Sequence, residues 1–489
     1  MRPSLWSRLL SFPAMLMTAL FVSPFIALLD VQQGGPVMRD PDIWWHLRNA
    51  EVLLSTHHFI RQELFSFTTP GQPWINPEWL AEIPFYLGYR VCGDLGLFLV
   101  MLAATELVIA AVFLLCYRRS GDPKAAFLAT WVAVLFASIN IGPRTILFGW
   151  LCFLVEMLLL EAFRKGRDWL WLLPPLFALW INLHGSWLIG LAFFLVFVAS
   201  GLAQGAWGSI EAVRWTPRQL TKLAVTCAAS VAMLFVNPYG WRLVAYPFDM
   251  IFHQQLNISI VDEWHSVDFG DFRGKMVFVV LSAMFVFTLA RRRAWPLHEL
   301  LFALLAFYAA LTHRRFLFLA GIVVCPMLAV ELIGSVFEPY EPKRNKPLLN
   351  LAFMAGYCLF ALWRLPASAA LRAAEPQYFP VSALPQLERC CAQGHLLNVY
   401  HWGGYLIWNA RDIPVFLDSR ADIFEHHGIL ADYLKATTLH DSLAILDRYQ
   451  IDSVLLPPGE ELVYLLKHTP GWGVQYEDST ATLLVRAAH

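Results

Sequence analysis

The sequence predicts an α-helical polytopic membrane protein that carries a small C-terminal α/β domain. Of its 489 residues, 58% are hydrophobic and only 15% are charged. In a soluble domain about a quarter of all residues are normally charged. The surplus of apolar side chains therefore needs a lipid bilayer as its solvent. The formal net charge of -1 provides no basic field for a nucleic acid, so we expect no nucleic-acid partner.

The second observation is a series of about eleven apolar runs near the spanning length of about 20 residues. They lie at 9–29, 95–116, 125–140, 145–163, 169–183, 186–204, 222–237, 276–290, 296–312, 316–334 and 347–365. The first run follows a positively charged start and has no small-residue cleavage site after it. We therefore expect it to be a retained membrane anchor and not a removed signal.

The connections between these runs predict the orientation in the membrane. Counted from a cytoplasmic N-terminus, the inside connections contain Arg118, Arg119 and Lys124; Arg164, Lys165 and Arg167; Arg214, Arg218 and Lys222; Arg291, Arg292 and Arg293; and Lys343, Arg344 and Lys346. Cytoplasmic loops carry such an excess of Lys and Arg. We expect a multi-pass protein of the bacterial inner membrane, with loops 30–94 and 238–275 and the tail 366–489 outside.

The chain therefore divides into a membrane domain, 1–365, and an extracytoplasmic tail domain, 366–489. In the tail, "HLLNVY", "PVFLDS", "DSVLLP", "GVQYED" and "ATLLVR" are predicted strands, and a helical stretch lies near 425–449. Strands that alternate with helical patterns indicate a small mixed sheet. Gly403 and Gly404 are expected to allow a tight turn after the first strand.

The eight cysteines predict neither a metal site nor a disulfide framework. They stand at 92, 116, 152, 227, 325, 358, 390 and 391, mostly inside apolar runs and without metal-ligand spacing. Cys390 and Cys391 are adjacent, a poor geometry for an ordinary bridge. We interpret the cysteines as small buried apolar residues.

The stretch "RDPDIWWHLRNAEVLL" at 39–54 follows the first run and supplies the candidate catalytic residues Asp40, Asp42 and His46. If 42–54 is helical, Asp42 and His46 share one face. Polar groups near the membrane are costly and are mostly functional. The alternative is a helix start, where Asp42 complements the dipole, beside an interfacial tryptophan pair.

Three candidate substrate-binding residues lie further along the chain. Glu78 in "PWINPEWLAE" is a second acid or a metal ligand, or else lies with Glu82 on a solvated helix face. Arg144 and His184 lie at the outer ends of spans, and Gly185 would let a partner approach His184 closely. The alternative for His184 is an ordinary interfacial residue.

Arg314 and Arg315 form an outer pair at the membrane boundary, which suits an anionic partner. Guanidinium groups bind phosphate oxygens in a bidentate manner. The alternative is pairing with Glu263 or Asp262. In the tail, Asp418 and Arg420 belong to a polar cluster at two strand ends, where they either line a binding cleft or reflect turn chemistry.

With an acidic pair just past the first span, the chain resembles the GT-C superfamily of membrane glycosyltransferases. The segments "DPDIWWHL", "FSFTTPGQPWINPEWL" and "YHWGGYLIW…LDSRAD" resemble a bacterial group of mostly uncharacterised proteins. The resemblance implies that Asp40 or Asp42 is a loop acid that acts as base or orients the acceptor. It also implies that Arg314 or Arg315 holds a carrier phosphate. In some members a divalent metal, Mg or Mn, accompanies the acid, here at Asp40 and Asp42.

The expected function is transfer of a sugar from a polyprenyl-phosphate carrier to a glycan, lipid or protein acceptor on the outer face of the membrane. Membrane lipid is the second expected partner. One alternative is a transporter or flippase for lipid-linked sugars, which would be expected to show matched halves. Another is a non-catalytic assembly partner in envelope polysaccharide export, which would tolerate loss of both aspartates.

Overall fold

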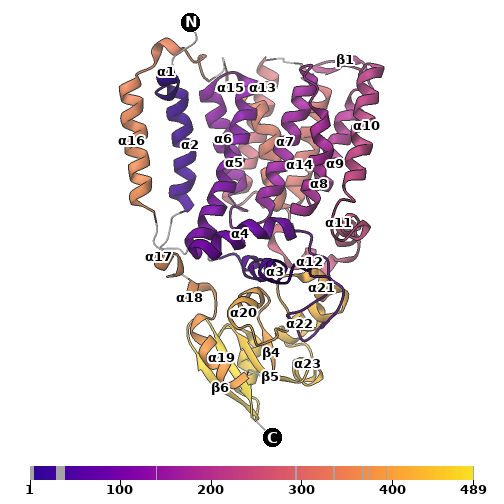
Figure 1. The fold of residues 1–489 in the computed structure, drawn as a ribbon, viewed down its shortest axis with the longest axis vertical. Helices are drawn as coiled ribbons and strands as arrows, with labels where there is room; N and C mark the ends of the chain where they lie inside the picture. Colours follow the sequence, from indigo (N-terminus) through magenta and orange to yellow (C-terminus); the bar gives the residue numbers. More distant parts are fainter. Residues whose placement is uncertain are drawn as a thin grey trace.

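The computed structural model describes residues 5–28, 39–138, 140–291, 294–333, 336–365, 368–373, 375–391 and 394–487. Within these ranges every predicted apolar run contains a helix, and the helices stand side by side in a bundle (Figure 1). They are α2 (Phe12–Leu28), α5 (Asp94–Ser120), α6 (Pro123–Ala137), α7 (Ile146–Arg164), α8 (Leu173–Leu183), α9 (Trp187–Ser200), α10 (Pro217–Met233), α13 (Phe272–Arg291), α14 (Leu297–Thr312), α15 (Leu317–Leu332) and α16 (Pro347–Trp363). A short helix, α1 (Leu5–Leu9), precedes them.

The lengths of these helices support a membrane bundle but leave the number of spans open. Four helical stretches of the described residues are long and apolar enough to cross a membrane: α5, α7, α13 and Arg314–Leu332. Shorter apolar helices lie at Phe12–Ser23, Pro123–Ala137, Leu170–Leu183, Trp187–Ser200, Leu297–Thr312 and Pro347–Trp363. Helix α10 falls in neither group, since its first turns carry Arg218 and Lys222. The count of about eleven spans stays a prediction.

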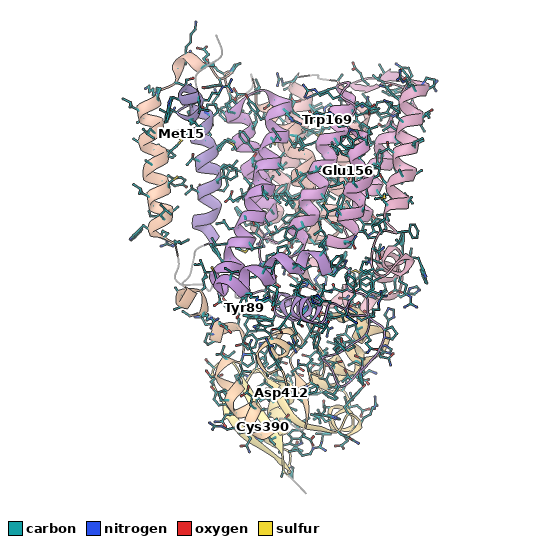
Figure 2. The ribbon with its side chains drawn as sticks, viewed as in Figure 1. Met15, Tyr89, Glu156, Trp169, Cys390 and Asp412 are labelled. Carbon is teal, nitrogen blue, oxygen red and sulfur yellow. A yellow bond between two sulfur atoms is a disulfide. The ribbon has the colours of Figure 1, made fainter. Side chains whose placement is uncertain are left out.

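The described parts of the basic connections gather at the end of the bundle away from the tail, and Arg292 and Arg293 lie outside the described residues. Arg119 at the end of α5 pairs with Glu299 at the start of α14, and Lys222 pairs with Asp168. Figure 2 places Trp169, the neighbour of Asp168, at this end, with Cys390 and Asp412 beyond the opposite end. A small sheet closes the same end, with the order β1 (Gly205–Trp207), β2 (Ile210–Ala212), β3 (Trp295–Pro296).

Four helices lie across the opposite end of the bundle, between it and the tail domain (Figure 1). They are α3 (Asp42–Thr56), α4 (Trp79–Cys92), α11 (Trp241–His253) and α12 (Gln255–Ile260). The predicted helix at 42–54 is thus confirmed. Helix α4 folds back tightly onto α5 at Gly88 and Gly96. A Cβ at Gly96 would lie 1.8 Å from the carbonyl oxygen of Gly88. Only glycine permits this approach, which holds α4 across the bundle end.

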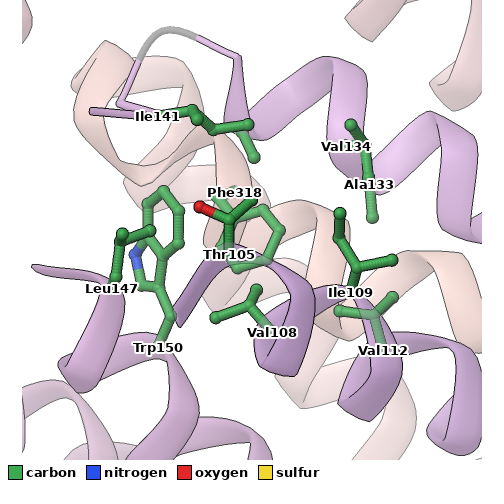
Figure 3. Close-up of a pocket in the computed structure, with 11 residues that line it drawn as sticks. Thr105, Val108, Ile109, Val112, Ala133, Val134, Ile141, Leu147, Trp150 and Phe318 are labelled. Carbon is green, nitrogen blue, oxygen red and sulfur yellow. The ribbon is translucent and has the colours of Figure 1, made fainter. Parts of the chain in front are cut away.

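The centre of the bundle is closely packed around α5, α6, α7 and α15. Figure 3 shows the residues that line a void of about 10 Å³ there, with Thr105 among aliphatic and aromatic side chains. A void of this size holds at most about one water molecule. Helix α7 begins two residues after Arg144, and helix α15 begins two residues after Arg315. The packed helices therefore give these two arginines a rigid base.

The tail domain is a four-stranded mixed sheet with helices around it (Figure 1). The sheet order is β4 (His395–Asn398), β5 (Ile451–Leu456), β7 (Thr482–Arg486), β6 (Trp472–Glu477), in which β4 and β5 are parallel and the other pairs antiparallel. The helices are α17 (Ser368–Arg372), α18 (Glu375–Tyr378), α19 (Leu384–Cys391), α20 (Gly403–Asn409), α21 (Ala421–His426), α22 (Ile429–Thr437), α23 (Ser442–Arg448) and α24 (Glu461–Lys467). Four of the five predicted strands and the helical stretch are confirmed.

The prediction of a strand at 414–419 is wrong. Val415 makes only isolated bridges, to Ser66 of the first loop and to Leu396 of β4. Its amide donates to the carbonyl oxygen of Phe65 and its carbonyl accepts from the amide of Phe67. The segment is apolar because it lies buried between two parts of the chain, and not because it belongs to a continuous ladder.

Two smaller expectations about the tail also need correction. Gly403 and Gly404 open helix α20 and make no tight turn; a Cβ at Gly404 would lie 2.6 Å from the carbonyl oxygen of Pro41. Gly404 is small because the start of α3 approaches closely, and at Gly403 a Cβ would lie 2.3 Å from the carbonyl oxygen of Leu417. Cys390 and Cys391 are joined as a disulfide between neighbours at the end of α19.

Candidate active site

One cavity of about 460 Å³ lies where the bundle, the crossing helices and the tail domain meet. Its polar lining includes residues from distant parts of the chain: Asp42, His46, Glu78, Arg144, His184, Tyr246, Glu263, Arg315, Tyr400, Ser419, Arg420 and Asp422. Its apolar lining comes mainly from the bundle and includes Trp150, Phe153, Ile189, Leu319 and Ile322. Clefts that combine an apolar wall with a few convergent polar groups are typical ligand sites.

The two candidate aspartates of the first loop have different surroundings. Asp42 lines the cavity, and its Oδ1 accepts a hydrogen bond from the Ser419 hydroxyl of the tail. Burial and the negative charge of Asp40 raise the pKa of Asp42 above its ordinary value, although Arg144 and Ser419 oppose this. Asp40 is 5% exposed and is absent from the cavity lining. The structure therefore separates a cavity acid, Asp42, from a supporting acid, Asp40.

Asp40 holds the backbone and Arg144 in place. Its Oδ1 accepts from the amide of Asp42 at 3.0 Å, at the start of α3, and its Oδ2 accepts from Nε of Arg144. Arg144 also pairs through Nη1 with Glu263. Although burial opposes the charged form, Asp40 and Glu263 raise the pKa of Arg144. Arg144 is thus a permanently charged group whose charge is matched within the protein.

A chain of hydrogen-bonded and paired groups runs from α3 to the α8–α9 connection. Nδ1 of His46 lies 2.9 Å from Oε1 of Glu82, and Nε2 of His46 lies 3.5 Å from Oε2 of Glu78. Oε1 of Glu78 lies 3.3 Å from Nε2 of His184. Burial disfavours a charge on His46, but the hydrogen bond and charge of Glu82 raise its pKa. The carboxyl groups of Glu82 and Glu78 therefore favour the charged form of His46, and Glu82, 1% exposed, is no part of a solvated face.

His184 stays neutral and acts as a donor to Glu78. Its Nδ1 accepts from the amide of Ser186 at 3.0 Å, so the ring proton belongs on Nε2. Burial and the charge of Arg315 lower the pKa of His184 to about 3. Helix α7 can approach this turn because Gly149 has no side chain. A Cβ at this position would lie 2.4 Å from Oγ of Ser186. At Gly185, by contrast, a Cβ would meet nothing within 4 Å, consistent with its place on the cavity wall.

The two arginines of the outer pair face different surroundings. Arg314 pairs with Asp262 at 3.0 Å and does not line the cavity, as the alternative interpretation expects. Arg315 lines the cavity and lies over the ring of Trp264, with 4.2 Å from its guanidinium carbon to the ring centroid. Within the described ranges, no carboxylate lies at ion-pair distance from Arg315. Arg315 is therefore the cavity cation that still offers its charge.

The tail residues Asp418 and Arg420 form a buried ion cluster with Glu63 of the first loop. Nη2 of Arg420 lies 2.5 Å from Oδ2 of Asp418, and Nη1 of Arg420 lies 2.8 Å from Oε2 of Glu63. Both carboxylates are almost fully buried. Asp418 does not line the cavity, whereas Arg420 does, with its charge already matched. Asp418 and Arg420 therefore serve mainly to join the tail to the first loop, and less to line a binding cleft.

Tyr246 and Ser419 are cavity residues that the sequence analysis did not single out, whereas Asp422 belonged to the polar cluster predicted in the tail. Ser419 and Asp422 lie inside the quoted "LDSRAD" segment, so their position beside Arg420 was the available signal. Tyr246 lies in the aromatic stretch of α11, where nothing distinguishes it from an interfacial side chain. It lines the same cavity as Asp422 of the tail, an arrangement of distant segments that sequence spacing does not reveal.

The pair Asp40 and Asp42 does not fit a divalent metal. Both oxygens of Asp40 are occupied, one by an amide and one by the Arg144 guanidinium, whose positive charge would repel a cation. Mg²⁺ and Mn²⁺ bind to free carboxylate oxygens. Among the described residues, no group of three or more His, Cys, Asp or Glu side chains has an arrangement that could hold a metal ion.

Comparisons with known proteins identify the fold. No protein-family model matches the chain, and no curated protein matches it in sequence. The apo structure of the Archaeoglobus fulgidus oligosaccharyltransferase matches with a TM-score of 0.56 and 12% identity, over 91% of this chain and 69% of that one. The same enzyme tethered to an acceptor peptide with the NVT sequon gives 0.54 and 13%, over 92% and 70%.

A bacterial structure of similar length also matches. ArnT from Cupriavidus metallidurans, bound to undecaprenyl phosphate, gives a TM-score of 0.54 and 15% identity, over 96% of this chain and 98% of that one. Both proteins are membrane glycosyltransferases of the GT-C superfamily. At these identities the likeness establishes the fold and not the reaction. The chain therefore has the GT-C fold, as its resemblance implied.

Proposed function

We propose that this protein is a glycosyltransferase that moves a sugar from a polyprenyl-phosphate carrier to an acceptor on the outer face of the membrane. The observation that carries the proposal is Arg315, a cavity-lining guanidinium without a carboxylate partner among the described residues. An unmatched guanidinium at a membrane boundary suits a phosphate, because its planar fork donates to two oxygens at once.

The apolar wall of the same cavity suits the lipid part of the donor. Phe153, Leu319 and Ile322 belong to bundle helices α7 and α15. A prenyl chain that lies along these helices gains contact with apolar side chains and reaches the cavity from the bilayer. The bound undecaprenyl phosphate named for ArnT supports a lipid of this class as the donor carrier.

Asp42 is the proposed base. The acceptor hydroxyl loses its proton to the Asp42 carboxylate as its oxygen forms a bond to the anomeric carbon of the donor sugar. The bond between that carbon and the phosphate oxygen breaks at the same time. Polyprenyl phosphate then leaves with an additional negative charge, which Arg315 stabilises as it develops. Arg144 and Asp40 orient Asp42 through the α3 start and take no part in the proton transfer.

The neighbouring arginines allow a matched test of the donor site. Purified protein in lipid nanodiscs is titrated with undecaprenyl phosphate. Arg315→Ala should weaken binding about 10- to 100-fold, the range for loss of hydrogen bonds to a charged group. Arg314→Ala, whose side chain pairs with Asp262 outside the cavity, should bind as the unchanged protein does. Equal affinities in both variants contradict the donor site.

The reaction itself is tested with a panel of polyprenyl-phosphate sugars and measured release of the lipid phosphate. Asp42→Asn should lower the rate about 10²- to 10⁴-fold, as expected for loss of a general base. Its thermal unfolding should stay close to that of the unchanged protein. Full transfer by Asp42→Asn sinks the proposed mechanism, and lipid binding without any transfer favours the transporter or the assembly partner.

A further inference from the structure

The cavity has two halves of different chemistry. The half formed by the bundle and η5 (Arg314–Phe316) holds the unmatched cation Arg315 and the apolar wall. The half formed by α3, α11 and the tail holds two carboxyl groups, Asp42 and Asp422, together with hydroxyl and ring groups. The hydroxyl and ring groups belong to Trp45, Trp74, Tyr246, Tyr400 and Ser419.

Asp422 is not needed by the reaction proposed above, yet it is placed as a ligand-binding group. It lies on α21 of the tail and lines the cavity together with Tyr246 of α11. Burial raises the pKa of Asp422 to about 7. Near neutral pH the carboxyl therefore exists in both forms, so it can accept from a ligand hydroxyl or donate to one.

The tail half offers no unmatched positive charge. Its two cationic groups on the described cavity wall, Arg420 and His46, are both paired. Nη2 of Arg420 lies 2.5 Å from Asp418 and Nη1 lies 2.8 Å from Glu63, and Nδ1 of His46 lies 2.9 Å from Glu82. An anionic ligand in this half would meet Asp42 and Asp422 without a free cation to offset their charge. A ligand rich in hydroxyl groups would instead find carboxylates, hydroxyls and aromatic faces.

The position of Ser419 joins this half to the proposed base. Ser419 donates to Asp42 and precedes Asp422 by three residues, at the start of the segment that enters α21. The hydroxyl of Tyr400 donates to the carbonyl oxygen of Ser419 at 3.1 Å. A ligand held at Asp422 and Tyr246 therefore lies on the same wall as Asp42.

We propose that Asp422 and Tyr246 form an acceptor subsite for a neutral polyhydroxylated ligand, a sugar residue of a glycan. This inference rests on the proposed transferase function for its role as acceptor, but the binding that it predicts does not require a donor. The carboxyl and phenol recognise ring hydroxyls, and the neighbouring rings of Trp45 and Trp74 cover its apolar face.

The test measures glycoside binding to full-length protein in nanodiscs by saturation-transfer NMR, with no lipid donor present. The probes are p-nitrophenyl glycosides of several hexoses and pentoses, dodecyl phosphate, and a short peptide with Ser, Thr and Asn. Asp422→Asn and Tyr246→Phe should each weaken glycoside binding, by about tenfold for the charged group. The control is Tyr476→Phe. Tyr476 lies on β6, and its hydroxyl donates to Asp478 at 2.6 Å.

Three results together support the subsite. Glycosides bind to the unchanged protein, both subsite variants weaken this binding, and Tyr476→Phe leaves it unchanged. Three results overturn the subsite: no glycoside binds, the phosphate or the peptide binds in their place, or the variants bind glycosides as the unchanged protein does. Tyr246→Phe removes one oxygen only and guards against a folding defect in Asp422→Asn. Failure of the transferase proposal appears elsewhere, as undecaprenyl phosphate binding that is indifferent to Arg315.

Discussion

Ser419 is the residue through which the tail domain acts on the proposed base. Its hydroxyl donates to Asp42 and accepts from Nε1 of Trp45 at 3.1 Å. A hydrogen bond to the ionised form of an acid favours that form. Ser419 therefore opposes the rise in the pKa of Asp42 that burial and Asp40 cause.

Removal of this hydroxyl should shift the pH dependence of transfer. Activity requires ionised Asp42 and is lost as the pH falls through the pKa of that carboxyl. Ser419→Ala raises this pKa further, so the acidic limb of kcat/KM against pH should move to higher pH. Ser442→Ala, which removes a hydroxyl bonded to the carbonyl of Ala436 elsewhere in the tail, serves as the control. An unmoved limb, or one that moves to lower pH, contradicts the role given to Ser419.

Chelation should leave transfer unchanged, because Asp40 has no free oxygen for a metal shared with Asp42. The measurement is the transfer rate before and after dialysis against EDTA. Asp40→Asn should still lower the rate, since it releases Arg144 and the first amide of α3. A rate that EDTA removes and Mg²⁺ or Mn²⁺ restores would contradict this interpretation.

The sequence located the site but did not divide its roles among neighbours. The stretch 39–54 and the arginine pair were recognisable as costly polar groups at a membrane boundary. Which of Asp40 and Asp42, and which of Arg314 and Arg315, faces the cavity depends on contacts with Arg144 and Asp262, far away in the chain. No local pattern encodes that Tyr246 of α11 lines the same cavity as Asp422.

At the scale of elements, an ion cluster fastens the tail to the first loop. Arg420 pairs with Asp418 and with Glu63, and Glu63 also accepts from the amides of Phe65 and Ser66 at 2.7 Å and 2.8 Å. The segment 414–419 bridges the same loop. Its apolar run satisfied the sequence pattern of a strand, yet its neighbours belong to a different part of the chain.

Arg420→Ala should destabilise this junction strongly. It leaves two buried carboxylates without a partner, and breaking a buried pair costs about 3–5 kcal/mol. Thermal unfolding of the purified protein should begin at a lower temperature, and limited proteolysis should cleave near the junction sooner. The control is Arg486→Ala, whose partially exposed pair with Asp447 should contribute about 0–1 kcal/mol. Equal effects of the two variants contradict the structural role of Arg420.

At the scale of the whole molecule, the chain has two chemically distinct ends. Basic connections and the small β1–β3 sheet lie at one end, and the cavity and tail domain at the other (Figure 1). Periodicity and charge counts predicted this arrangement because a bilayer imposes strict length and charge rules on each helix. The crossing helices α4 and α11 obey no such rule, and their placement depends on tertiary packing.

The orientation of these ends in the membrane can be measured with fusions. Alkaline phosphatase joined after the last residue should be active, because the enzyme folds only outside the cytoplasm. The same reporter placed at 165–167, in a connection predicted to be inside, should be inactive. The reverse pattern would contradict the predicted topology and, with it, an outer-face reaction.

The cavity wall also has a consequence for biosynthesis. The last lining residues to leave the ribosome, after every bundle helix has been made, are Tyr400, Ser419, Arg420, Ala421 and Asp422. A nascent chain that has already inserted its helices thus lacks one wall of the cavity and the hydroxyl beside Asp42. A lipid donor that meets a chain not yet made as far as Asp422 therefore finds an incomplete site.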